Sequence, residues 1–108
     1  MFRIAVLVSL VVGACATDSS TGIDPSAITC PPESTLTYEN YGQLVIEEQC
    51  LSCHASKERP KLGTLEDVRA SRQAIMRTAV SSTSMPRGTG MLLEERQILG
   101  EWLACGAP

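Results

Sequence analysis

The strongest constraint on this chain is a five-residue run, Cys50-Leu51-Ser52-Cys53-His54, which has the pattern C-x-x-C-H. Two thiols separated by two residues can each form a thioether with a vinyl group of one haem, and the adjacent histidine can bind the iron. The run therefore predicts one covalently bound haem c, attached through Cys50 and Cys53, with His54 as an iron ligand. The rest of the chain would then have to fold around that group.

Two other chemistries use a C-x-x-C pair. A thioredoxin-like site places the pair between a strand and a helix, and no strand pattern precedes Cys50. A tetrahedral zinc site needs four ligands, and no second cysteine pair lies near Cys53 and His54. We favour haem attachment, and a haem-free thiol oxidoreductase is the less favoured alternative.

The N-terminal segment has the layout of an export signal. Arg3 provides a positive charge, residues 4–12 form a short apolar run, and small residues precede Cys15, as in a bacterial lipobox. We predict that residues 1–14 are removed as a lipoprotein signal peptide and that Cys15 is lipidated; ordinary cleavage near Ala16 is the alternative. The domain would then be exported and lipid-anchored on the periplasmic side of a membrane. Ala16, in place of an aspartate, favours the outer membrane.

Composition limits what the remaining residues can do. Residues 15–35 are rich in Ser, Thr and Pro and predict a flexible tether, which leaves residues 36–108 as one small domain. The net charge of −3 and the lack of a basic run exclude a nucleic-acid partner. A domain of this size with few aromatic side chains can bury only a small hydrophobic core. We therefore expect a haem or a covalent cross-link to add to its stability.

The five cysteines can be divided among three roles. If Cys15 carries lipid and Cys50 and Cys53 carry haem, Cys30 and Cys105 remain and would form a disulfide in an oxidising compartment. Closing so long a loop would stabilise the fold by about 4 kcal/mol at most. Two unpaired thiols, or a bridge to one of the C-x-x-C sulfurs, are the alternatives that the sequence leaves open.

Apolar residues recur with helical spacing in three segments, which predicts helices over residues 38–49, 64–80 and 93–104. Thr64, followed three residues later by an acid, is typical of a helix N-cap, and Gly106 is a plausible C-terminal stop. No segment alternates with a period of two, so the expected fold class is all-α. The expected inward-facing residues are Tyr38, Tyr41, Leu44, Val45 and Ile46 in the first segment, Leu65, Val68, Ile75, Met76, Ala79 and Val80 in the second, and Ile98, Leu99, Trp102 and Leu103 in the third.

These features resemble the class I cytochrome c family over nearly all of residues 36–108. Gly42 lies eight residues before Cys50, as in that family, and Ile46 stands where the family usually has phenylalanine. The resemblance implies a small domain of about three helices around one haem. It also implies that Gly42 lets the first helix cross the last one closely, with Trp102 packed at the crossing.

The second axial ligand is expected to be a methionine. His54 is the only histidine, so a second histidine ligand is excluded. Met85, followed by Pro86, resembles the methionine loop of the family, and we favour it over Met91; an open or exchangeable position is the other alternative. The resemblance also implies that the carbonyl of Pro60 orients His54.

The predicted function is one-electron transfer with redox protein partners, as a carrier rather than an enzyme. No residues suited to general acid–base catalysis accompany His54. A haem-based module that senses or binds a small ligand, with a labile Met85, is the main alternative. The sequence does not decide whether the chain is a subunit of a larger redox enzyme.

Overall fold

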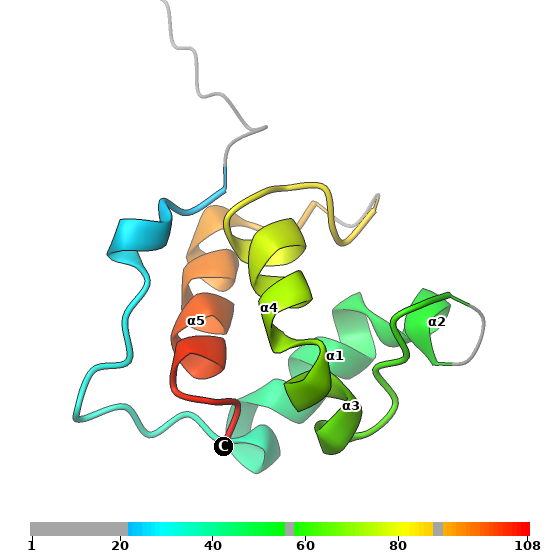
Figure 1. The fold of residues 1–108 in the computed structure, drawn as a ribbon, viewed down its shortest axis with the longest axis horizontal. Helices are drawn as coiled ribbons and strands as arrows, with labels where there is room; N and C mark the ends of the chain where they lie inside the picture. The colour runs from blue at the N-terminus through cyan, green and yellow to red at the C-terminus, as the bar shows by residue number, and fades with distance from the viewer. Residues whose placement is uncertain (1–21, 56–57, 88–89) are drawn as a thin grey trace, which may run out of the picture.

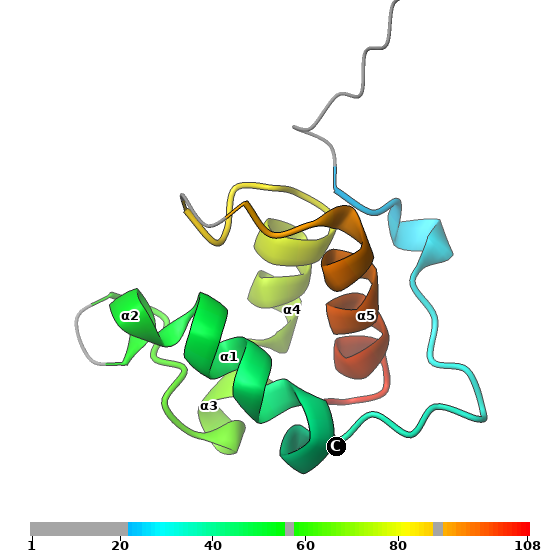
Figure 2. The same ribbon diagram turned by 180° about the vertical axis from the view of Figure 1, so that it is seen from behind.

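The computed structural model describes residues 22–55, 58–87 and 90–108 (Figures 1 and 2). The predicted signal peptide and Cys15 lie outside these residues. Within them, every regular element is helical, which confirms the all-α prediction. The elements are η1 (Pro25–Ala27), η2 (Tyr38–Gly42), α1 (Gln43–Gln49), α2 (Leu51–His54), α3 (Leu65–Ala70), α4 (Arg72–Ile75), η3 (Met76–Val80) and α5 (Leu93–Ala104).

The first predicted helix is formed by η2 and α1, which follow one another without a gap. It begins at a capping box: the Thr37 hydroxyl accepts from the backbone N–H of Asn40 at 3.1 Å, and the Thr37 N–H donates to Asn40 Oδ1 at 2.8 Å. Ile46 is buried, but Leu44 is 59% exposed, so the prediction that Leu44 faces the core is wrong.

The second predicted helix is present but interrupted. Thr64 caps α3 as expected, its hydroxyl accepting from the N–H of Asp67 at 3.1 Å. The backbone of Ser71 leaves helical geometry (φ −99°, ψ 9°), and α4 and η3 continue beyond it. Val68 and Ile75, on either side of this break, are both buried in the core.

The third predicted helix is α5, with the expected bounds, and it crosses the first helix at Gly42. Gly42 has helical backbone angles, so it lies inside the continuous helix rather than at its start. A Cβ on Gly42 would lie 2.5 Å from Cη2 and 2.7 Å from Cε2 of Trp102, and closer still to Cζ2. The ring of Trp102 is fully buried and meets Tyr41 edge-on, with 6.1 Å between ring centroids. The close crossing that the cytochrome c resemblance implied is therefore present.

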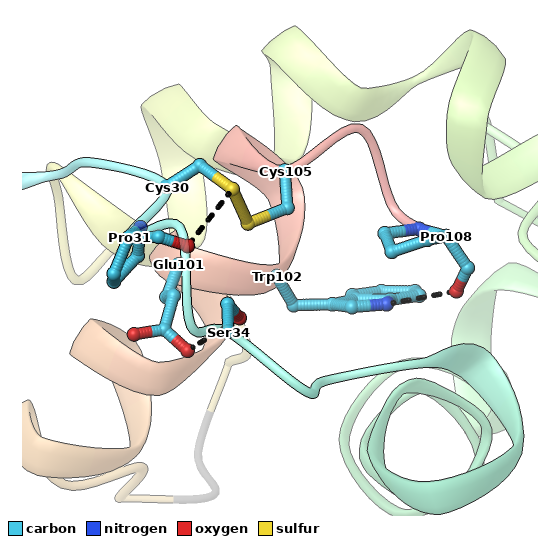
Figure 3. The surroundings of a disulfide bond; sticks show 7 residues. All are labelled: Cys30, Pro31, Ser34, Glu101, Trp102, Cys105 and Pro108. Atoms are coloured by element: carbon cyan, nitrogen blue, oxygen red, sulfur yellow. Dashed lines mark hydrogen bonds between the residues drawn. A yellow bond between two sulfur atoms is a disulfide. The ribbon is translucent and has the colours of Figure 1, made fainter.

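The segment before the first helix lies along α5 (Figure 3). Cys30 and Cys105 form a disulfide across 75 residues, with 4.9 Å between their Cα atoms, as the cysteine count predicted. Ser34 donates from its hydroxyl to Glu101 at 2.9 Å. Further toward the N-terminus, the N–H of Ile23 donates to the carbonyl of Val80 at 2.7 Å. The tether predicted over residues 15–35 is thus held against the domain from about residue 22 onward.

The core lies where α1, the α3–η3 helix and α5 meet (Figures 1 and 2). Trp102, Leu99 and Leu103 of α5 are buried, whereas Ile98 is 44% exposed, so its expected place in the core is wrong. The full set of buried hydrophobic residues is Ile46, Leu62, Val68, Ile75, Ala79, Val80, Met91, Leu99, Trp102, Leu103 and Ala107.

Candidate haem-attachment site

The C-x-x-C-H run forms a single helical turn directly after α1. The Cys50 N–H donates to the carbonyl of Ile46 at 3.0 Å, which joins the run to the end of α1. The carbonyl of Cys50 then accepts from the N–H groups of Cys53 at 3.3 Å and His54 at 3.0 Å. One peptide group therefore sets the relative positions of the two thiol-bearing residues and the histidine.

The two cysteines differ in environment. Cys50 is half-buried and packs against the core, while Cys53 is exposed. Neither takes part in the Cys30–Cys105 disulfide. Burial raises the pKa of Cys50 to about 11, so its thiol stays protonated at neutral pH.

His54 is oriented by the loop that follows it. Its Nδ1 lies 2.7 Å from the carbonyl oxygen of Pro60, which can only accept, so Nδ1 carries the proton and Nε2 has the lone pair. The N–H of Leu62 donates to the His54 carbonyl at 2.8 Å, and the Leu62 side chain is buried. The contact expected between His54 and Pro60 is present, and it leaves Nε2 as the nitrogen able to bind a metal.

Met85 lies in the loop between η3 and α5. Its side chain is half-buried against the core, and its backbone N–H donates to the carbonyl of Thr78 at 2.9 Å. Met91 is 7% exposed and belongs to the core, as a packing residue would.

Arg96 of α5 is a contact of the Met85 loop that sequence reasoning missed. It is only 3% exposed, and its guanidinium donates to the carbonyl of Met85 at 2.6 Å. Burial lowers its pKa, which the nearby Glu95 carboxylate partly opposes. A signal was available: Arg96 lies three residues before Leu99 and seven before Leu103, on the buried face of α5.

The described residues also bear on other sites. None of them form a group of three or more His, Cys, Asp and Glu side chains that could hold a metal ion, so a four-ligand zinc site at Cys53 and His54 has no support there. Over residues 22–55, 58–87 and 90–108, no helix combines the length and apolarity needed to cross a membrane.

Comparison with known proteins adds no further identification. No protein-family model, no curated protein and no solved structure matches this chain. The functional assignment therefore rests on the residues themselves: the Cys50–His54 turn, the His54–Pro60 hydrogen bond and the Gly42–Trp102 crossing.

Proposed function

We propose that this chain is a mono-haem c-type cytochrome that transfers single electrons to and from redox proteins at an exported membrane surface. The observation that carries the proposal is the turn at Cys50–His54, in which the carbonyl of Cys50 accepts from the backbone N–H groups of Cys53 and His54 and so fixes the spacing of the two thiol-bearing residues and the histidine. The hydrogen bond from Nδ1 of His54 to Pro60 adds to it, because a histidine that binds iron usually donates its other N–H in this way.

The donor set fits a covalently bound haem. Cys50 and Cys53 would attach it, and His54 and Met85 would bind its iron. When bound, haem supplies an iron that changes oxidation state by one electron. Ligation by His54 and Met85 would raise the reduction potential of the iron.

The protein's own contribution is to hold the ligands still. The carbonyl of Cys50 fixes the backbone of His54, and the carbonyl of Pro60 fixes its ring. The N–H of Met85 is bonded to Thr78, on a helix separate from α2. Electron transfer requires little rearrangement when both ligands remain in place, and this arrangement favours a carrier.

The proposal can be tested by haem staining of the purified protein on a denaturing gel. A covalent haem should stay with the chain, and the Cys50→Ser/Cys53→Ser variant should lose the stain. The matched control is Cys30→Ser/Cys105→Ser, which also removes two cysteines but should keep the stain. An unstained wild-type chain, expressed with haem-attachment machinery, would refute the proposal.

The absorption spectrum of the oxidised protein tests the second ligand and separates a carrier from a ligand-binding module. We expect a methionine-to-iron charge-transfer band that is lost in Met85→Ala and kept in Met91→Leu. A wild-type spectrum of high-spin iron that binds small ligands readily would favour the sensing module instead. Retention of the band in Met85→Ala would exclude Met85 as the ligand.

A further inference from the structure

Arg96 is a charged side chain buried beneath the Met85 loop. Its Nη1 donates to the carbonyls of Met85 at 2.6 Å, Ala79 at 2.7 Å and Ser82 at 3.4 Å, and its Nε donates to Met91 at 3.2 Å. Within the described part of the chain these acceptors are backbone carbonyls rather than carboxylates. Burying a guanidinium costs free energy unless its N–H groups are hydrogen-bonded. These bonds therefore stabilise the buried position of Arg96 and at the same time hold the loop in place.

Two of these carbonyls, those of Ala79 and Ser82, lie at the C-terminal end of η3 or just beyond it. Ala79 is in the last turn of η3 and Ser82 lies just beyond it, where helix carbonyls lack partners of their own and a positive charge is favourable. Met85 follows in the same loop. The Arg96 guanidinium therefore satisfies carbonyls at the end of η3 and also holds the backbone of Met85.

The peptide groups of Met85 are held from both directions. Its N–H donates to Thr78 of η3, and its carbonyl accepts from Arg96 of α5. Ser84 adds a third bond, from its hydroxyl to the same Thr78 carbonyl at 3.2 Å. The backbone around Met85 is thereby fixed to two helices, although the residue lies in a loop.

We propose that Arg96 is a positioning residue for Met85: it holds the Met85 backbone so that the thioether stays available as the second axial ligand. This inference rests on the proposed haem-binding function. The guanidinium suits the role because its nitrogens reach several carbonyls at once in a rigid plane, which a lysine ammonium on a flexible chain cannot reproduce. Loosening Arg96 should free Met85 to be displaced.

The experiment compares imidazole binding to the oxidised, haem-loaded protein in wild type, Arg96→Lys and Arg96→Gln. External imidazole must displace Met85 to bind iron, so its apparent affinity reports how firmly Met85 is held. We expect about tenfold tighter imidazole binding in Arg96→Lys, since one charge-assisted hydrogen bond is worth at least that factor. Arg96→Gln should bind imidazole at least as tightly, and the methionine-to-iron band should weaken in both.

Arg69→Gln is the matched control. Arg69 also donates to a backbone carbonyl, that of Ala107 at 2.9 Å, but on the C-terminal segment rather than the Met85 loop. Its loss should leave imidazole affinity unchanged. In a Met85→Ala background, Arg96→Lys should likewise leave imidazole affinity unchanged, because there is no methionine left to position. A general loss of stability would instead change the affinity in both backgrounds.

The outcomes separate this inference from the proposed function. A stained protein in which Arg96→Lys leaves both the band and the imidazole affinity unchanged would refute the role of Arg96 alone. An equal effect of Arg96→Lys with and without Met85 would also refute it, by showing a structural role only. A wild-type chain without covalent haem would refute the proposed function itself. If Arg96→Gln fails to fold, Arg96→Lys, which keeps the charge, still decides the question.

Discussion

Replacement of Gly42 by alanine should destabilise the protein, although alanine is the better helix former. The added Cβ would lie 2.5 Å from Cη2 and 2.7 Å from Cε2 of Trp102, well inside normal contact distance. The indole cannot easily move aside. It is fully buried, it packs edge-on against Tyr41, and its Nε1 donates to the carbonyl of Pro108 at 3.3 Å (Figure 3).

The size of the effect follows from two opposing terms. Overpacking a filled site costs up to about 3 kcal/mol, and a rigid, buried ring places Gly42→Ala near that upper value. Replacing glycine by alanine inside a helix stabilises the folded state by about 1 kcal/mol. The net loss in the free energy of unfolding should be about 2 kcal/mol, or a fall in Tm of about 8 to 16 °C for a domain of this size.

Urea unfolding of the purified protein, followed by far-UV circular dichroism, would measure this loss. Gly63→Ala is the matched control, because among the described residues its Cβ would meet the Ala55 carbonyl at an ordinary 3.8 Å and no closer atom. It should change stability by less than about 0.5 kcal/mol. If Gly42→Ala is as stable as the wild type, or no less stable than Gly63→Ala, the close packing of η2 on Trp102 at Gly42 is not what holds the two helices together.

Two further predictions concern the cysteines. Cys30→Ser/Cys105→Ser should lower the free energy of unfolding by up to about 4 kcal/mol, because it releases a 75-residue loop in the unfolded chain; thermal unfolding with and without a reductant measures this, and a wild type insensitive to reductant would contradict it. Cys15→Ser should move the protein from the membrane fraction to the soluble periplasmic fraction, because it removes the predicted lipid anchor; continued sedimentation with membranes would contradict lipidation at that residue.

Local patterns predicted most of the helical architecture. The segments 38–49, 64–80 and 93–104 were predicted from periodicity, and the bounds of α5, Leu93–Ala104, agree with the prediction. Thr64 was predicted as a cap, and Gly106 takes the positive φ of 95° that a helix stop requires. These features depend on residues close together in the chain, so the sequence alone contains what is needed to predict them.

Periodicity was less informative about which residues are buried. Leu44 and Ile98 belong to apolar stripes, but both lie at the edge of their helix face and are exposed. The break at Ser71 was not predicted, and neither was the packing of residues 22–35 along α5. Each depends on where a neighbouring element lies, which a local pattern does not contain.

The candidate haem-attachment site also combines features that the sequence predicts with features that depend on the fold. The sequence by itself determined the Cys50–His54 run, since five adjacent residues carry its chemistry, and the cysteine count pointed to the Cys30–Cys105 bond without deciding its connectivity. The cytochrome c resemblance implied the contact between His54 and the Pro60 carbonyl, which the structure places 2.7 Å apart, whereas only the tertiary structure placed Arg96 beneath the Met85 loop. A buried arginine needs several acceptors to offset its desolvation, and here those acceptors come from residues 79–91, which only folding brings around one side chain.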